Sequence, residues 1–418
     1  MSASRTSYSS SLNFFGTSTP AALAAEFGSP LYVYNEKVLR QKCRDMSKLV
    51  ALPGFVACYS TKANGNPHLL RIIREEGLMA DAMSPGELAV LHKAGFDKSR
   101  INYVCNNVSA EELRLAAREA AHVSVDSLAQ LETFGRVNPG APVMVRVNPG
   151  IGAGHHAKVI TAGKETKFGV NPELFGDMLE IIARHKLQLV GLNQHVGSLF
   201  MDAGSFVQAA QWLLETARAF PGISVIDFGG GFGIPYRKYD GEALLDLAEL
   251  GASLTQLLAG YRKSSGFSGE FVVEPGRYVV AESSILLGTV HAVKNNGPTR
   301  YAGTDLGFTI LARPMMYGSF HDVEVYPGND VPRAAMPQTV VGNICESGDI
   351  LAQNRILPEI MPGDTLGILD GGAYGHAMSS NYNQRMRPAE VLVQEDGSVR
   401  LIRRRDTLED LLAVYPGL

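Results

Sequence analysis

Between about residue 36 and residue 282 the sequence alternates short, apolar, β-rich runs with longer amphipathic segments. This alternation is typical of repeated βα units, in which helices cover a parallel sheet. Eight strands with intervening helices over roughly 250 residues is the size of a TIM barrel. The sequence therefore predicts an α/β chain built around a (β/α)8 barrel. The expected strands are Phe55–Tyr59, Leu78–Ala82, Ile101–Cys105, His122–Val125, Val143–Val147, Leu189–Leu192, Ser224–Phe228 and Phe271–Val273.

Two of the amphipathic segments begin with helix start signals. Ser84-Pro-Gly-Glu87 supplies a capping serine, a proline at the first helical position and a glutamate at the third. Ser109 followed by Glu112 repeats the capping pattern. These signals predict helices directly after the second and third strands.

The pattern changes after about residue 283, where β-rich runs with short turns replace the βα alternation. The segment before residue 36 contains Pro30-Leu-Tyr-Val-Tyr34, which is predicted to add a strand to this second unit. We therefore expect a barrel over residues 36–282 and a β-rich domain over residues 1–35 and 283–418. The predicted strands after the barrel are Ile285–Val293, Gln338–Cys345, Thr365–Leu369, Glu390–Val393 and Val399–Ile402.

The composition is that of a folded globular protein, with 45% hydrophobic and 19% charged residues in 418. A net charge of −4 gives no reason to expect a nucleic-acid partner. No segment has the length of a membrane span, and the polar N-terminus lacks the apolar core of a signal peptide. The four cysteines show no CxxC spacing, so we expect free thiols, no metal site and a cytoplasmic location.

Polar residues follow the predicted barrel strands at their carboxyl ends, the face where TIM barrels build active sites. A general tendency of polar residues to lie in loops explains this position, but it does not explain the choice of Lys, His, Arg and Glu beside glycines. We therefore predict an active site there. The residues are Lys62, Asp81, Asn106, Asn107, Asp126, Arg146, His195, Gly229-Gly-Gly231 and Glu274.

Lys62 directly follows an apolar strand, in Tyr59-Ser-Thr-Lys-Ala-Asn-Gly-Asn66. A lysine that emerges from a core is unusual, because its charge is costly to bury without a partner. Forming a Schiff base with an aldehyde cofactor would remove that cost. The alternative is a lysine whose apolar stem lies along the barrel rim. The position of Lys62 after an apolar strand, taken alone, favours this alternative.

The run Asp227-Phe-Gly-Gly-Gly-Phe-Gly-Ile-Pro-Tyr236 offers successive backbone N–H groups that can bind a phosphate. It is not a dinucleotide fingerprint, since Pro235 lies where a helix should already be running. Glu274, in Glu274-Pro-Gly-Arg277, can keep a pyridine nitrogen protonated, or it can form a buried ion pair with Arg277. His195 can stack on a flat cofactor or serve a structural role.

In this order along the chain, these motifs resemble the fold-type III, alanine-racemase-like pyridoxal-phosphate enzymes, and among them the diaminopimelate decarboxylase family. The resemblance covers nearly the whole chain, from Pro30 to Arg405. The blocks that carry it are Tyr59-Ser-Thr-Lys-Ala-Asn64, Arg146-Val-Asn-Pro-Gly150, Glu274-Pro-Gly-Arg277, Cys345-Glu-Ser-Gly-Asp349 and Gly372-Ala-Tyr-Gly-His-Ala-Met-Ser-Ser-Asn-Tyr-Asn383.

The resemblance implies pyridoxal 5′-phosphate as cofactor, bound to Lys62 as a Schiff base, with His195 stacked on its ring and Glu274 at its nitrogen. Cys345 would donate a proton after carbon dioxide leaves. The phosphate would be bound by Ser198, Gly230, Gly231 and Tyr374, and the cofactor pocket would also include Asp81, Arg146, Gly276 and Arg277. The distal end of an amino-acid substrate would contact Arg277, Arg313, Tyr317, Glu346 and Tyr374.

In this family the loops that carry Cys345 and Tyr374 reach across a dimer interface, so the resemblance implies a homodimer with shared active sites. It also implies decarboxylation of meso-diaminopimelate to L-lysine. Two arginines and a glutamate suit a zwitterionic distal end, whereas ornithine would leave the arginines unpaired.

Three positions depart from the pattern of the family. Asn193 replaces the first histidine of His-x-His-x-Gly-Ser, and Thr309-Ile310 replaces a frequent Asn-Asp pair. Gly342-Asn343-Ile344 precedes the Cys-Glu pair, where the family usually has Gly-Pro. The alternatives are a decarboxylase of D-ornithine, D-lysine or a carboxylated polyamine, or an inactive binding paralogue. An alanine racemase would normally lack the glutamate at the pyridine nitrogen.

Overall fold

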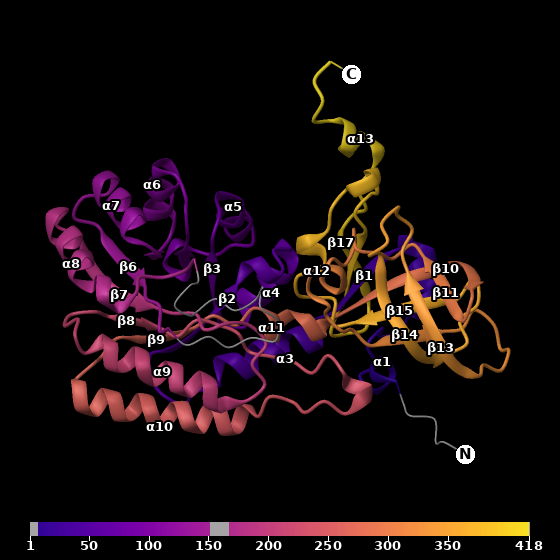
Figure 1. The fold of residues 1–418 in the computed structure, drawn as a ribbon, viewed down its shortest axis with the longest axis horizontal. Coiled ribbons are helices and arrows are strands. Elements are labelled where there is room, and N and C mark those ends of the chain that lie inside the picture. Colours follow the sequence, from indigo (N-terminus) through magenta and orange to yellow (C-terminus); the bar gives the residue numbers. More distant parts are fainter. Residues whose placement is uncertain (1–6, 151–166, 418) are drawn as a thin grey trace. The chain divides into compact units, whose positions relative to one another are not determined.

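The computed structural model describes residues 7–150 and 167–417 (Figure 1). The chain forms two compact units. Unit 1 comprises the described residues of 1–39, 235–242 and 280–418, and unit 2 comprises those of 40–234 and 243–279. The boundaries predicted from sequence, 36–282 for the barrel, include residues 235–242, whereas the structure assigns these residues to unit 1.

Unit 2 is a closed barrel in which each strand pairs in parallel with the next and the last pairs with the first. All eight predicted strands are present, with ends shifted by at most two residues, so the predicted (β/α)8 barrel is confirmed. Its strands are β2 Phe55–Ser60, β3 Met79–Ala82, β4 Ile101–Val104, β5 His122–Val125, β6 Pro142–Arg146, β7 Gln188–Asn193, β8 Val225–Asp227 and β9 Glu270–Val273.

Helices lie outside these strands (Figure 1). Ser84 and Ser109 cap their helices as predicted, each accepting a hydrogen bond from the backbone N–H three residues later. No α-helix follows β8 directly; the chain instead runs through Pro235 to a short 3₁₀ turn at Lys238–Asp240. The helices are α3 Glu36–Ser47, α4 Pro67–Glu75, α5 Pro85–Lys93, α6 Ala110–Glu119, α7 Leu128–Val137, α8 Phe175–Arg184, α9 Ala203–Ala217, α10 Leu247–Ser265 and α11 Arg277–Val280.

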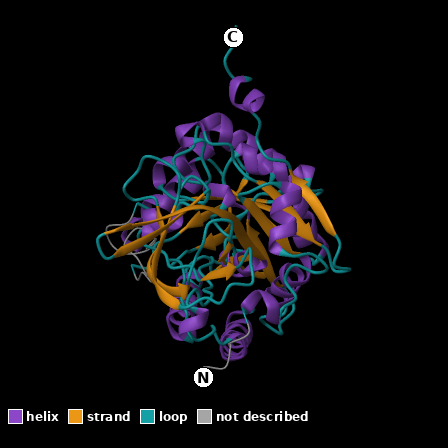
Figure 2. Ribbon diagram, turned by 90° about the vertical axis from the view of Figure 1, so that its right-hand side faces the viewer, coloured by secondary structure: helices purple, strands orange, loops and turns teal. Residues whose placement is uncertain are grey.

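Unit 1 is a mostly antiparallel sheet. Figure 2 shows the strands of both units in orange. The strand order is β14-β13-β11-β10-β1-β16-β17, and β15 pairs with both β10 and β12. The strands are β1 Leu31–Asn35, β10 Ser284–Asn296, β11 Thr299–Thr304, β12 Val323–Tyr326, β13 Ala335–Val341, β14 Ile350–Pro358, β15 Thr365–Leu369, β16 Ala389–Val393 and β17 Val399–Arg403. Short helices accompany them: α1 Tyr8–Ser11, α2 Pro20–Phe27, α12 Arg313–Tyr317 and α13 Leu408–Leu412.

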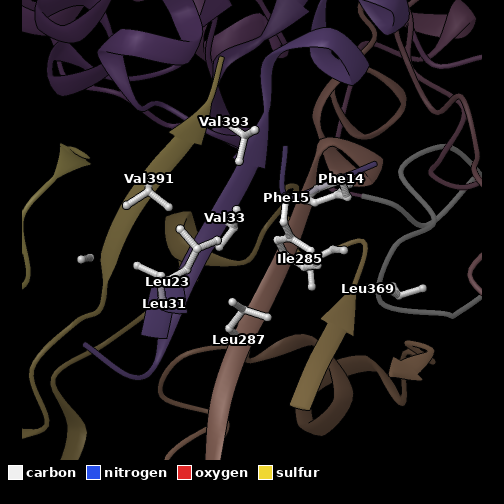
Figure 3. Packing of buried hydrophobic residues seen from close by; sticks show 11 residues of the cluster. Phe14, Phe15, Leu23, Leu31, Val33, Ile285, Leu287, Leu369, Val391 and Val393 are labelled. Atoms are coloured by element: carbon white, nitrogen blue, oxygen red, sulfur yellow. The ribbon is translucent and has the colours of Figure 1, made fainter. Parts of the chain in front are cut away.

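The predicted N-terminal strand is confirmed as β1, which lies between β10, antiparallel to it, and β16, parallel to it. Its residues Leu31 and Val33 pack against Ile285, Leu287 and Val391 in the buried core of the sheet (Figure 3). The predicted strand Gln338–Cys345 is wrong at its end, because β13 stops at Val341. The chain turns there, and the N–H of Gly342 donates to the carbonyl of Asp349.

No helix in the described part of the chain is both long enough and apolar enough to cross a membrane.

Candidate active site

Lys62 lies in the short 3₁₀ turn Thr61–Ala63 that follows β2 at its carboxyl end. Thr61 and Ala63 are buried, which fixes the turn, while the Lys62 side chain is exposed. Burial raises the pKa values of Asp81 and Glu274, and the positive charge of Lys62 lowers both by a smaller amount. The lysine therefore acts electrostatically on the end of the barrel predicted to hold the active site.

Three buried carboxyl groups gather at this end of the barrel: Asp81 on β3, Asp227 on β8 and Glu274 after β9. Burial raises the pKa of each, to about 7 for Asp227 and well above the ordinary value for the other two. The negative charges reinforce the effect, since Asp227 raises the pKa of Glu274 and Glu274 that of Asp81. Such a cluster retains protons near neutral pH and favours a cationic partner.

Ser60 links two of these carboxyl-bearing residues. Its hydroxyl lies 2.7 Å from Asp81 Oδ2 and 3.2 Å from the carbonyl oxygen of Glu274. The N–H of Glu274 donates to the carbonyl of Gly229 at 2.9 Å. The backbone that carries Glu274 is therefore held to β2 on one side and to the glycine run on the other.

The side chains of Glu274 and Arg146 fit a bound pyridoxal ring. Glu274 Oε1 and Arg146 Nη2 are buried, and neither has a hydrogen-bond partner among the described residues. Buried polar atoms are normally paired, so these two indicate a ligand with complementary groups. A protonated pyridine nitrogen is such a group for a carboxylate.

His195, in the loop after β7, is held by the glycine run. The N–H of Gly230 donates to its Nδ1 at 3.2 Å, so Nδ1 is unprotonated in this contact. Burial lowers the pKa of His195 well below its ordinary value, and the charges of Lys62 and Arg146 lower it further. The ring is therefore neutral and offers a flat surface on which a heteroaromatic cofactor can stack.

The glycines of the run are required by packing. A Cβ on Gly230 would lie 2.1 Å from the carbonyl oxygen of Glu274, and one on Gly229 would lie 2.2 Å from that of Gln194. Gly231 has a φ of +110°, and a Cβ there would meet the carbonyl of Gly197. The run thus brings its backbone against the ends of both neighbouring strands.

Arg277 and Ser198 also lie together, since Arg277 Nη2 donates to Ser198 Oγ at 2.9 Å. Arg277 is buried at the start of α11. A Cβ on Gly276 would lie 3.1 Å from that of Ser60 and 3.2 Å from that of Ala63, next to the Lys62 turn. In unit 2 the structure therefore brings together Lys62, Asp81, Arg146, His195, Ser198, Gly230, Gly231, Glu274, Gly276 and Arg277 at the carboxyl ends of the barrel strands.

In unit 1 the remaining predicted residues lie on three loops that contact one another, which we call the loop cluster: residues 307–318, 342–349 and 371–384. The N–H of Phe308 donates to Asp349 Oδ1 at 2.7 Å, and that of Ser380 donates to the carbonyl of Thr309 at 2.9 Å. The rings of Phe308 and Tyr382 lie 5.8 Å apart. Asp349 therefore serves to hold the loop that carries Cys345 and Glu346.

Cys345 and Glu346 each contact the third loop. The Cys345 thiol lies 3.4 Å from Asn383 Nδ2, and the Tyr382 hydroxyl donates to Glu346 Oε1 at 2.8 Å. Cys345 is exposed, whereas Cys43, Cys58 and Cys105 are buried and all four thiols are free. Tyr374 follows β15 in the left-handed region, with a φ of +56°.

Arg313 begins α12 and is buried; its Nη1 lies 2.8 Å from His321 Nε2. Tyr317 ends the same helix and is half-buried. Arg313, Tyr317, Cys345, Glu346 and Tyr374 thus belong to one region of unit 1.

Asn343 and Ile310, two of the four residues that depart from the family pattern, accept hydrogen bonds through their main-chain carbonyls. The carbonyl of Asn343 accepts from Arg385, and that of Ile310 accepts from the Tyr32 hydroxyl at 2.7 Å. Thr309 and Ile310 are buried, and Asn193 is the buried last residue of β7. These contacts are made by main-chain atoms, so they do not depend on the side chains that differ.

Several neighbours of the site were not predicted from the sequence. Asp227 was considered only as the start of the glycine run, although its place at the end of a buried strand is the same signal that identified Glu274. Tyr382 and Asn383 contact Glu346 and Cys345, which are remote in sequence, whereas His321 contacts Arg313 only eight residues away.

Comparison with known proteins agrees with this geometry. Residues 36–281 match the family described as pyridoxal-dependent decarboxylase, pyridoxal binding domain. The diaminopimelate decarboxylase of Methanothermobacter thermautotrophicus is 40% identical over 95% of this chain and 94% of that protein. The chain belongs to the diaminopimelate decarboxylases. The enzyme of that name from Escherichia coli K12 is 36% identical, over 94% of this chain and 95% of its own.

A solved structure supports the same conclusion. The diaminopimelate decarboxylase of Helicobacter pylori, complexed with L-lysine, superposes with a TM-score of 0.84 at 29% identity, over 92% of this chain and 96% of that one. Family membership confirms the predicted resemblance, the decarboxylase class and pyridoxal phosphate as cofactor.

Proposed function

We propose that this protein decarboxylates meso-2,6-diaminopimelate to L-lysine and carbon dioxide, the last step of lysine biosynthesis. The observation that carries this proposal is the cluster at the carboxyl end of the barrel. There, an exposed Lys62 acts on a buried Glu274 that has an oxygen without a hydrogen-bond partner among the described residues. The names of the relatives, at up to 40% identity over nearly the full length, supply the substrate.

The barrel residues bind and orient the cofactor. When bound, pyridoxal phosphate would stabilise, by delocalisation, the electron pair left on the α-carbon as carbon dioxide departs. Lys62 would hold the aldehyde of the cofactor, and Glu274 would hold a proton on its ring nitrogen. His195 offers the neutral surface for stacking. Ser198, Gly230, Gly231 and Tyr374 bind the phosphate, and Asp81, Arg146, Gly276 and Arg277 complete the pocket.

Arg277 and residues of the loop cluster are proposed to recognise the distal end of the substrate. Arg277, Arg313, Tyr317 and Tyr374 bind the distal carboxylate, and Glu346 accepts from the distal ammonium, since a guanidinium suits a carboxylate and a carboxylate suits an ammonium. Cys345 transfers its thiol proton to the α-carbon that has lost carbon dioxide. The carbon keeps the electron pair of the broken C–C bond and uses it to form the new C–H bond.

We further propose that the protein acts as a homodimer in the cytoplasm, with the Cys345 and Tyr374 loops of one copy completing the site of the other. The resemblance to the family and the location of these loops outside the barrel support the dimer. The free cysteines support a reducing compartment.

Substrate selection is tested by comparing kcat/KM for meso-diaminopimelate, D-lysine and D-ornithine. Loss of one charge-assisted contact in a desolvated pocket costs about 1.5–3 kcal/mol, roughly ten- to a hundredfold. Arg313→Ala is therefore expected to lower kcat/KM with diaminopimelate by that factor and to affect any activity on D-lysine far less. Arg300→Ala, which removes an ion pair with Glu359 elsewhere in unit 1, is the control. Equal losses on both substrates contradict the assigned role of Arg313.

A further inference from the structure

Arg313 has a side chain that is almost completely enclosed, with 2% of its surface exposed. A guanidinium in such surroundings interacts strongly with a carboxylate that reaches it, because water does not screen the charge. Its selectivity then depends on how firmly the planar group is oriented.

His321 makes the contact that orients it. His321 is 1% exposed and forms two contacts of 2.8 Å, from Nε2 to Arg313 Nη1 and from Nδ1 to the carbonyl oxygen of Leu369. A guanidinium only donates and a carbonyl only accepts, so the ring must donate from Nδ1 and accept at Nε2. His321 is therefore neutral, with its proton on Nδ1.

A neutral acceptor has a different effect from a carboxylate in the same place. The His321 contact fixes Nη1 without cancelling the charge of Arg313. Tyr236 adds a second neutral contact, with its ring centroid 4.6 Å from Arg313 Cζ. The rings of Tyr236 and His321 meet edge to face, 5.1 Å apart, so the three side chains contact one another.

The backbone around this group is fixed by strand pairing and by a buried ion pair. Leu369 ends β15, and its N–H donates to the carbonyl of Asp322, next to His321. Lys238 lies 2.8 Å from Asp370 and donates to the carbonyl of Pro235, which anchors the segment that carries Tyr236. His321 and Tyr236, which both contact Arg313, therefore have fixed positions.

We propose that His321 is a positioning residue for substrate selection, which orients the Arg313 guanidinium toward the distal carboxylate through its neutral Nε2. This inference rests on the proposed function, because it takes Arg313 as the group that binds that carboxylate. His321 itself does not contact the substrate.

Two substitutions separate the roles of the two ring nitrogens. The amide of His321→Gln reaches as far as Nε2 and offers Arg313 an acceptor, whereas the amide of His321→Asn reaches only as far as Nδ1 and keeps the contact with Leu369. We expect His321→Asn to raise KM for meso-diaminopimelate roughly tenfold or more, with bound-cofactor absorbance unchanged, and His321→Gln to restore it to within about threefold of wild type. His291→Asn, on the exposed part of β10, is the matched control.

A double-mutant cycle gives the second readout. If His321 acts through Arg313, adding His321→Asn to Arg313→Ala changes kcat/KM by less than about twofold. The inference is overturned if the two substitutions lower kcat/KM by independent factors that multiply. It is also overturned if His321→Gln is as impaired as His321→Asn. If the His321→Asn variant does not fold, Tyr236→Leu is tested instead and is expected to raise KM. An unchanged KM in that variant contradicts the inference. A wild-type enzyme inactive on diaminopimelate refutes the proposed function itself, and this shows before any variant is compared.

Discussion

Glu274 is the residue on which the electron-withdrawing role of the cofactor depends. It is buried beside Asp227, and its Oε1 has no hydrogen-bond partner within the described residues. Glu274→Gln keeps the shape but cannot carry the negative charge that holds a proton on the ring nitrogen. We expect cofactor absorbance to persist while kcat falls by about a hundredfold or more. Glu270→Gln, at the exposed start of the same strand, is the control, and equal turnover in both variants refutes the role.

Asp227 gives the barrel a pH-dependent stability. Burial raises its pKa to about 7, compared with about 3.9 in an unfolded chain. Between these values the folded protein holds a proton that the unfolded chain has released, so this stabilisation is complete at low pH and is lost as the pH rises toward 7.

Asp227→Asn retains an acceptor for the N–H of Gly229, which lies 2.9 Å from Oδ1, but does not ionise. In cofactor-free protein, the Tm of this variant relative to wild type should therefore increase between about pH 5 and about pH 7.5. The matched control is a substitution at exposed Asp177. A relative Tm that falls over this range is the opposite of the expected result.

At the residue scale, a candidate site residue can be identified from the sequence where its signal is local. Lys62 and Glu274 each follow a buried strand, and this position alone identifies them as candidates. The pairing of Arg313 with His321 was not predicted, although the two are only eight residues apart. That contact depends on Leu369, which reaches His321 only when β12 pairs with β15.

At the element scale, the barrel strands were predictable because parallel strands buried on both faces read as short apolar runs. Strands β11, β12 and β14 were missed. β14, Ile350–Pro358, has only two buried residues, which are followed by Gln353, Asn354 and Arg355. It is stabilised by pairing with β13, which local composition does not reveal.

The glycine run tests whether the loop geometry matters. Gly230→Ala places a methyl group where the carbonyl of Glu274 already lies, at 2.1 Å. We expect this variant to lose about 1–3 kcal/mol of stability and to bind pyridoxal phosphate less tightly.

Gly260→Ala provides the contrast, since Gly260 is an exposed residue of α10 and nothing lies within 4 Å of its added Cβ. It should leave cofactor binding unchanged and raise stability by up to about 1 kcal/mol. Thermal unfolding and cofactor titration measure both effects. If Gly230→Ala and Gly260→Ala both bind the cofactor as tightly as wild type, the close packing at Gly230 is not needed for cofactor binding.

At the scale of the whole molecule, two domains were predicted from the change in sequence pattern. The segment 235–242 could not be assigned in this way, because it lies in the middle of the barrel sequence. Lys238 is buried in an ion pair with Asp370 and another with Glu282, and these contacts join the segment to unit 1. Only tertiary contacts between distant parts of the chain define that membership.

The proposed homodimer has a direct consequence for mixed variants. A Lys62→Ala chain and a Cys345→Ala chain are each expected to be inactive, yet a hybrid dimer contains one site with both residues intact. Random reassortment should restore about a quarter of the wild-type sites. A mixture of Lys62→Ala with Glu274→Gln, both on the barrel, should restore none. If hybrids demonstrably form and the first mixture stays inactive, the shared site is refuted.

Product analysis determines whether the protein converts meso-diaminopimelate to L-lysine. The purified protein is incubated with pyridoxal phosphate and carboxyl-labelled meso-diaminopimelate, and carbon dioxide and lysine are measured, with the lysine resolved by chirality. We expect equimolar carbon dioxide and L-lysine from the wild type and neither product from Lys62→Ala. Absence of L-lysine, or faster consumption of D-ornithine or D-lysine under the same conditions, would contradict the proposed function.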